Sequence, residues 1–247
     1  MTLHANRLRN YLFTVTLFLL LMQLAAISAL AQYGVTTCGS ISEPGHYTLQ
    51  NDLNCTVTDG IDILVPDVEL NLNGHTITGG SNNIGIDISA SRARVLGPGT
   101  INGFSVGLVA QFTTQDVEVT GVTSTGASGV GFVARFAKVK WKGNTASGSA
   151  GQGFELLPGN DSDLSGNHAT GNAAEGFLIS GNHNHLMLNT ALNNGTVGIS
   201  VTGSHNEMIS NSALGNTNFD LSDGDPNCGD NRWVHNVFST ANETCIH

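Results

Sequence analysis

Charged residues and large polar aromatic residues are scarce in this chain of 247 residues. Charged residues make up 11% of it, and it contains only two tryptophans, three tyrosines and five prolines. Nine basic residues stand against 19 acidic ones, which gives a formal net charge of −10. A chain with this balance lacks the basic surface that binds nucleic acids or anionic polymers, so neither is expected as a partner.

Two patterns of apolar residues are also missing. After the first 31 residues, no apolar run is long enough to span a membrane. No apolar stripe recurs at helical spacing, and the leucine signature of leucine-rich repeats does not occur. These absences exclude a helical protein and a leucine-rich solenoid.

The sequence does contain a repeat with a period of 22 to 24 residues. Each copy opens with a glycine, continues with a short in-out alternation that begins on an aromatic or branched residue, and ends a second alternation on an asparagine. The opening glycines are Gly85, Gly107, Gly131, Gly153, Gly176 and Gly198, and the asparagines are Asn144, Asn167, Asn189, Asn211 and Asn236. Short strands joined by turns at a fixed period predict a parallel β-helix.

Two segments resemble a known superfamily. The segment LNLNGHTITG, residues 70–79, resembles an early coil of the pectate-lyase-like β-helix proteins, and the later N-x-A-x-x-N coils resemble NosD-type repeats. The resemblance covers about residues 60–236. It implies an all-β, single-domain, right-handed parallel β-helix with about eight coils of 22–25 residues. It does not imply one activity, because this fold hosts many.

The N-terminal segment 1–31 is typical of a secretory signal peptide. Arg7 and Arg9 precede an apolar stretch at 11–24, and Ala29-Leu30-Ala31 forms a small-x-small cleavage site. We therefore expect a secreted or periplasmic protein cleaved after Ala31, without a membrane span. Two of the nine basic residues lie in this segment, so the remainder has seven basic and 19 acidic residues and a net charge of −12.

The exported part divides into an N-terminal cap at 32–59, coils at 60–218, and a last coil with a C-terminal cap at 219–247. Its four cysteines form two pairs with equal separation, Cys38 with Cys55 and Cys228 with Cys245. Several coils stacked about 4.8 Å apart separate the two ends, so local pairing within each pair is expected. Such disulfides would close the open ends of the solenoid of an exported protein. We expect a monomer.

Asp62 and Asp87 form the first candidate site. Both point outward on the strand that follows the coil glycine, one coil apart. Two stacked carboxylates could bind Ca²⁺ or divide acid and base roles on a polysaccharide. The same column continues, by sequence register, to Val109, Val133, Glu155, Leu178, Ser200 and Asp220. No complete catalytic motif of the lyases, polygalacturonases or epimerases of this superfamily is present, so catalysis stays open and solvated acids are the simpler interpretation.

The second candidate site is a histidine cluster. His183 and His185 alternate on one outward face, and the repeat places His205 over His183 and Glu207 over His185. Stacked imidazoles can share Cu²⁺ or Zn²⁺, and the NosD resemblance links such proteins to periplasmic copper handling. The alternative is that repetition alone produced the column.

Two further patterns concern the surface. Charges of alternating sign recur four residues before each turn asparagine: Glu69, Arg94, Asp116, Lys140, Asp163, His185, Glu207 and Arg232. They predict a structural charge ladder that fixes register. Four acids near the C-terminus, Asp220, Asp223, Asp225 and Asp230, fit a polar cap, with Ca²⁺ as the alternative.

Sugar-binding surfaces usually present exposed aromatic rings. Trp141 and Trp233 fall on the inward phase and are expected in the core, so no aromatic platform is evident. The sequence therefore favours a non-catalytic structural or binding module. A carbohydrate-active enzyme using Asp62 and Asp87 is the alternative, a NosD-like copper-handling protein is third, and a polysaccharide remains a candidate partner.

Overall fold

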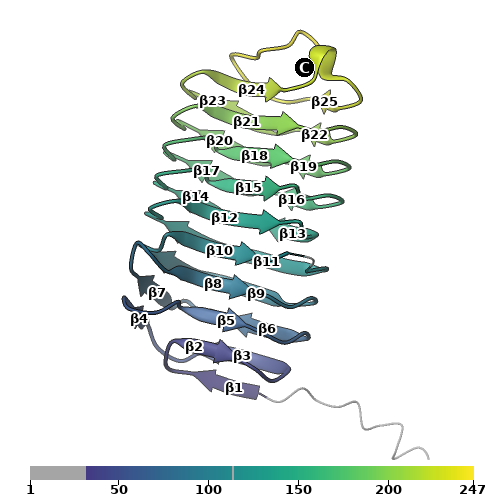
Figure 1. Cartoon of the computed structure of the whole chain (residues 1–247). Helices are drawn as coiled ribbons and strands as arrows, with labels where there is room; N and C mark the ends of the chain where they lie inside the picture. Colours follow the sequence, from purple (N-terminus) through teal and green to yellow (C-terminus); the bar gives the residue numbers. More distant parts are fainter. Residues whose placement is uncertain (1–31, 113) are drawn as a thin grey trace, which may run out of the picture. The chain divides into compact units, whose positions relative to one another are not determined.

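The computed structural model describes residues 32–112 and 114–247, which lie in one compact unit. The predicted signal peptide, residues 1–31, lies outside the described residues. The unit is a parallel β-helix in which 25 strands stack turn upon turn, from β1 at the bottom of Figure 1 to β25 near the top. Its one helical element is the short 3₁₀ turn η1 (Pro226–Cys228). No described helix is long and apolar enough to cross a membrane.

The first sheet contains nine parallel strands, one from each turn of the β-helix, which is close to the expected number of about eight. They are β2 (Gly39–Ile41), β5 (Ile61–Ile63), β8 (Ile84–Ile88), β10 (Val106–Ala110), β12 (Val130–Arg135), β15 (Phe154–Leu157), β18 (Phe177–Ser180), β21 (Val197–Thr202) and β24 (Phe219–Asp223). We call it the nine-stranded sheet.

The second sheet contains 16 strands and folds around the other two sides of each turn. Its long column is β1 (Gln32–Val35), β3 (Gly45–Leu49), β6 (Val68–Asn71), β9 (Arg94–Asn102), β11 (Val117–Thr125), β13 (Val139–Lys142), β16 (Asp163–Ser165), β19 (His185–Met187), β22 (Glu207–Ile209) and β25 (Arg232–Val234). Its remaining strands are β4 (Leu53–Cys55), β7 (Thr76–Gly79), β14 (Thr145–Ser147), β17 (His168–Thr170), β20 (Thr190–Leu192) and β23 (Ser212–Leu214). The predicted N-terminal cap thus supplies β1 to β4.

The repeated glycines lie where the chain enters the nine-stranded sheet. A Cβ atom added to Gly153 would lie 2.8 Å from the backbone oxygen of Gly176 in the next turn, and one added to Gly176 would lie 2.6 Å from that of Gly198. Such contacts are too close for a side chain, so the tight stacking of turns selects glycine at this corner.

The core is filled by side chains that stack in columns. Phe132, Phe154 and Phe177 are fully buried, with ring centroids 4.9 and 4.8 Å apart between neighbours. Trp141 and Trp233 are buried as predicted. In a solenoid each residue packs on its equivalent in the next turn, which is why a repeated residue type becomes a continuous stack.

Three columns of buried asparagines run beside this apolar core. The first is the predicted one, in which each Nδ2 donates to the Oδ1 atom of the next turn at 3.0–3.1 Å. The columns are Asn144, Asn167, Asn189, Asn211 and Asn236; Asn172, Asn194 and Asn216; and Asn184, Asn206 and Asn231. These side chains satisfy turn backbone groups that would otherwise be buried without partners.

Both ends of the β-helix are fastened as predicted. Disulfides join Cys38 to Cys55 and Cys228 to Cys245. Two of the four C-terminal acids are buried: Asp220 ends the second asparagine column by accepting hydrogen bonds from Asn216, and Asp223 accepts one from the indole of Trp233 at 2.7 Å. These two carboxylates therefore serve as parts of the cap.

Candidate functional site

Two exposed phenylalanines lie side by side just after strands of the nine-stranded sheet. Phe112 follows β10 and Phe136 directly follows β12, and the two residues are 55% and 56% exposed. The ring centroids are 5.4 Å apart and the planes differ by 27°. Pro158 occupies the next turn beside them. Large apolar groups at this level of exposure cost free energy in water unless a ligand or partner uses them, so we call these three residues the aromatic lip.

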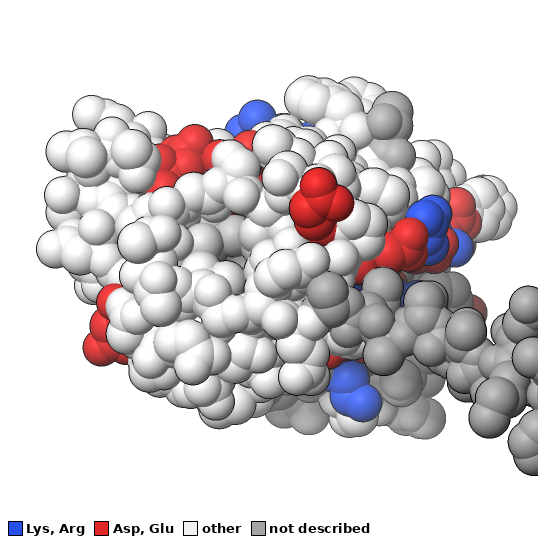
Figure 2. Space-filling view, turned by 90° about the horizontal axis from the view of Figure 1, so that it is seen from below, with Lys and Arg blue, Asp and Glu red and all other residues white. Residues whose placement is uncertain are grey.

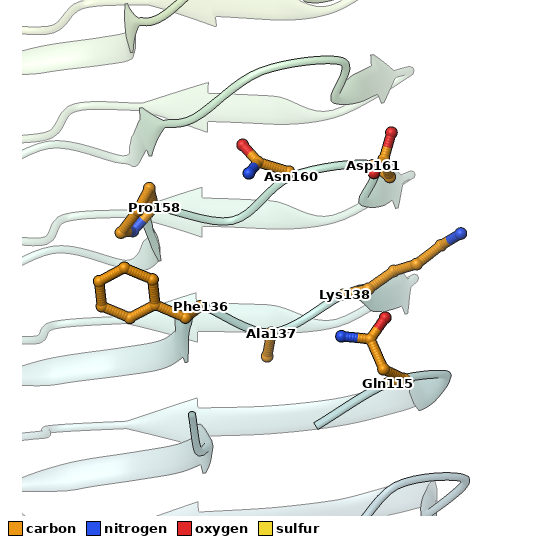
Figure 3. Close-up of a pocket in the computed structure, with 7 residues that line it drawn as sticks. All are labelled: Gln115, Phe136, Ala137, Lys138, Pro158, Asn160 and Asp161. Atoms are coloured by element: carbon orange, nitrogen blue, oxygen red, sulfur yellow. The ribbon is translucent and has the colours of Figure 1, made fainter. Parts of the chain in front are cut away.

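Phe136 adopts a left-handed backbone conformation, with φ of 52°. A bulky residue in this region costs about 1–3 kcal/mol, and such residues concentrate at binding and catalytic sites. The ring lies at the pocket near Pro158, as Figure 3 shows, and the exposure of Phe136 places it outside the core.

A shallow pocket of about 230 Å³ opens beside the aromatic lip (Figure 3). Gln115, Lys138, Asn160 and Asp161 line it together with Phe136, Ala137 and Pro158. Among the described residues, the side-chain amide of Gln115, the ammonium of Lys138 and the Nδ2 group of Asn160 have no hydrogen-bond partner. The pocket therefore combines an apolar ring with donors that a ligand can use.

The outer face of the nine-stranded sheet lies next to the aromatic lip, because Phe112 and Phe136 follow its strands β10 and β12. Val109 and Val133 point outward there but are almost fully covered by their neighbours, so they form an apolar floor. Glu155 follows in the same column and is half-buried; burial raises its pKa, which the nearby Arg135 partly offsets. Further along, the column ends on Ser222 and not on Asp220, because Ser200 pairs with Ser222.

Asp62 and Asp87 are neighbours on this face, as predicted, and pair in register between β5 and β8. The Asp87 carboxylate accepts hydrogen bonds from Gln111 at 2.9 Å and Ser89 at 3.3 Å, and burial raises its pKa. Ser40 donates to Asp62 at 3.2 Å. Asp87 is thus held by residues that directly follow β8 and β10, whereas the Oδ1 atom of Asp62 is buried without a hydrogen-bond partner among the described residues.

The charge ladder exists, with one correction. Arg94 and Lys140 are the register partners of Glu118 in the neighbouring strands. Glu118, and not Asp116, therefore belongs to the column of the charge ladder. The error arose because the segment between β10 and β11, from Ala110 to Glu118, is two residues longer than the equivalent segment from Ala134 to Lys140. Asp116 lies instead in a second column, two residues earlier in every turn.

The two columns together place a pair of like charges on each of five successive turns, and the sign alternates from one turn to the next. The pairs are Asp67 and Glu69, Arg92 and Arg94, Asp116 and Glu118, Lys138 and Lys140, and Asp161 and Asp163. Viewed from below in Figure 2, most of the visible surface carries neither sign, red atoms lie in several separate places, and red and blue atoms adjoin at the right of the view. The alternation brings opposite charges of neighbouring turns together, as in the ion pairs of Arg92 with Asp67 and of Arg94 with Glu118.

The histidine cluster continues the same two columns. The rings of His183 and His205 stack with centroids 5.0 Å apart, and the Nδ1 atom of His185 lies 3.2 Å from Glu207. Asp230 approaches the Nε2 atom of His205 to 3.8 Å. The predicted register is confirmed, but no group of three or more His, Cys, Asp or Glu side chains within 32–112 and 114–247 is arranged to hold one metal ion.

Sequence reasoning missed the aromatic lip. The signal was present: Phe112 and Phe136 each lie four residues after the equivalent core positions Leu108 and Phe132. The repeat therefore placed them in adjacent turns, outside the core alternation.

The family described as "Periplasmic copper-binding protein (NosD)" matches residues 62–246 of the chain. Two solved structures of the periplasmic alginate epimerase AlgG, a single and a double mutant, are similar with a TM-score of 0.44 and 12% identity in each case. The matches cover 72% and 74% of this chain, which spans only 55% and 58% of those chains. No curated protein matches significantly.

Proposed function

The chain belongs to the NosD family, and from this premise we propose that it is a non-catalytic binding protein of the periplasm that binds a saccharide on the aromatic lip. The family is described as periplasmic, and two disulfides fit an oxidising compartment. Export by cleavage after Ala31 completes this proposal, and N-terminal sequencing of the protein from the periplasm tests it.

The single observation that carries the proposal is the exposed stack of Phe112 and Phe136 beside a pocket lined with polar groups. The apolar face of a sugar ring stacks on an aromatic ring, while its hydroxyl groups need donors and acceptors around the rim. Gln115 and Asn160 supply such groups next to the ring of Phe136.

Binding without chemistry is supported by the column of outward residues. Asp87 is engaged by Gln111 and Ser89, whereas Asp62 accepts one hydrogen bond, from Ser40, and its Oδ1 atom has no partner among the described residues. The column between Asp87 and Glu155 is occupied by Val109 and Val133, which cannot transfer protons. A pair of carboxylates working as acid and base must face one scissile bond together.

The test is a binding titration of the mature protein with a panel of soluble polysaccharides, by calorimetry and affinity electrophoresis. We expect saturable binding of at least one polysaccharide that is lost in the double variant Phe112→Ser/Phe136→Gly. Phe219→Ser is the matched control, because Phe219 is also partly exposed but lies on β24, far along the chain from the lip.

Two results would contradict the proposal. The first is no binding to any member of the panel, or binding that survives in the double variant. The second is release of reducing ends or unsaturated products that disappears in Asp62→Asn/Asp87→Asn, because the enzyme alternative would then be correct.

Copper binding is a second candidate, favoured by the stack of His183 on His205. The two imidazoles and the carboxylate of Asp230 are donors that Cu²⁺ accepts. The described side chains do not meet the geometry of a three-ligand site, so the fit is incomplete and we place the saccharide first.

A further inference from the structure

Most basic residues of the described chain lie in one turn. The described part of the chain contains seven basic residues: Arg92, Arg94, Arg135, Lys138, Lys140, Lys142 and Arg232. Four of these seven fall between residues 135 and 142, on the end of β12, the following corner and β13. We call this segment the basic turn.

The basic turn also differs in how its charges are compensated. Arg92 pairs with Asp67 at 2.7 Å, Arg94 lies 3.5 Å from Glu118, and Arg232 lies 3.7 Å from Glu207. In the part of the chain that the structure describes, none of the four cations of the basic turn forms a salt bridge. Their charges are therefore available to a ligand.

The basic turn and the aromatic lip are one surface. Phe136 lies within the basic turn, directly after Arg135, and Lys138 lines the pocket beside its ring. Figure 3 shows the Lys138 side chain beginning next to Ala137 and extending away from the ring of Phe136. A sugar stacked on Phe136 would therefore lie between two positions of the chain that carry positive charge, Arg135 and Lys138.

Resting on the proposed saccharide function, we propose that the ligand is an anionic glycan chain that lies across the axis of the β-helix, along the basic turn. This proposal departs from the expectation that the net negative charge set for anionic polymers, because four cations gather in this one turn. Lys138 directly precedes β13, and Lys140 and Lys142 lie on it. The three lysines alternate with the buried Ala137, Val139 and Trp141, so they point outward in the same direction. A chain in this direction meets Arg135, the ring of Phe136 and the three lysines in succession.

The flanking turns restrict the width of the ligand. Asp116 and Glu118 lie on the turn before, and Asp161 and Asp163 on the turn after. Turns are about 4.8 Å apart, so a single glycan chain centred on the basic turn is closer to the cations than to the acids. A broad polyanion, such as a nucleic acid duplex, would meet both rows of acids, and the acidic molecule as a whole would repel it.

The experiment uses cellulose derivatives that share one backbone: hydroxyethyl cellulose is neutral, carboxymethyl cellulose carries carboxylates, and cellulose sulfate carries sulfates. We expect the intact mature protein to bind the anionic derivatives more tightly than the neutral one, and binding to weaken as salt increases. Comparison of the carboxylate and sulfate arms distinguishes the two sources of charge.

The key variant is Lys138→Gln/Lys140→Gln, which should weaken binding of the anionic derivative about tenfold or more, since each lost contact to a charged group is large. Asp161→Asn should strengthen it, because this substitution removes an acid from the pocket wall. Arg94→Gln is the matched control, because Arg94 occupies the ladder column of Lys140 but is already paired.

Three outcomes oppose the inference in distinguishable ways. If neutral and anionic derivatives bind equally well, and binding is unchanged in the lysine variant, the proposal of an anionic ligand is overturned and the saccharide function is left intact. Loss of binding in Arg94→Gln equal to that in the lysine variant overturns the role of the basic turn. Absence of binding to every glycan, with folding verified by circular dichroism, removes both proposals.

Discussion

At the residue scale, Phe136 is a position where a role in ligand binding can be distinguished from a role in folding. Its left-handed backbone costs free energy, and its ring is more than half exposed. A residue chosen for stability at this position would be glycine or asparagine, which adopt this conformation easily.

We therefore predict that Phe136→Gly changes the free energy of unfolding by no more than about 1 kcal/mol, because relief of backbone strain offsets the lost stack on Phe112. Saccharide binding should fall sharply in the same variant. Denaturant titration and calorimetry measure the two effects. A large loss of stability with unchanged binding would assign the ring to folding.

Asp220 gives a second prediction at this scale. Although burial raises its pKa, hydrogen bonds from Asn216, Ser239 and Thr240 outweigh burial and lower the pKa below the ordinary value. A carboxylate with a lowered pKa in the folded protein stabilises the fold above the ordinary pKa, and this contribution is lost as the pH falls.

We expect Asp220→Asn to destabilise the protein by about 1–3 kcal/mol at pH 7, since an amide cannot accept all of these hydrogen bonds. The difference from the natural protein should begin to shrink below about pH 4, where the carboxyl group binds a proton in the unfolded chain, and continue to shrink as the pH falls through the lowered pKa of the folded protein. Urea titrations of both proteins between pH 3 and pH 7 measure it. A difference independent of pH would show that the charge of Asp220 is not involved.

At the scale of elements, the stacked columns determine stability. Phe154 packs between Phe132 and Phe177, so its removal opens a cavity that the paired strands on either side, β12 and β18, cannot close. We predict that Phe154→Ala costs about 3–5 kcal/mol, measured by denaturant titration. Leu157→Ala, on the same strand but half-buried on the outer face, is the control and should cost much less. Similar losses for the two variants would contradict the inward stack.

His183 lies just before β19 and His205 just before β22, and their stack provides the test of the copper alternative. Calorimetric titration of the chelator-treated protein with Cu²⁺ at pH 7.5 should show saturable binding if His183 and His205 share an ion, and none in His183→Ala/His205→Ala. Binding should weaken as the pH drops through about 6.5, because protonated imidazoles do not bind metals. Binding that is unchanged in the double variant would exclude this pair as the site.

At the scale of the whole molecule, the β-helix is nearly one-dimensional, because each turn contacts chiefly its neighbours. Such arrays unfold from their ends, and this chain fastens each end with a disulfide.

We predict that Cys228→Ser/Cys245→Ser lowers stability by about 3 kcal/mol, the value for closing a loop of this length. Hydrogen exchange should then increase first in β24 and β25 while the central turns stay protected. Uniform acceleration along the chain would show that the molecule unfolds as one unit. The Cys38→Ser/Cys55→Ser variant tests whether the N-terminal end behaves alike.

The sequence by itself determined the fold, the phase of the core and the disulfide pairing. A repeated glycine and asparagine at nearly constant spacing leave one way to stack turns, so residues such as Phe154 and Trp141 are buried in any structure with this period. The stacking of His205 on His183 followed for the same reason. Local periodicity decides these features because every turn contacts its own copy.

Only the tertiary structure decided where the corners lie and what they expose. The turns between strands vary in length, so counting placed Asp116 in the column of Glu118, and Asp220 where Ser222 lies. The left-handed corner at Phe136 and its contact with Phe112 depend on the same variable turns. A strand repeat fixes what points inward, whereas the outer surface depends on the backbone angles of each corner, and the aromatic lip with its basic turn is formed there.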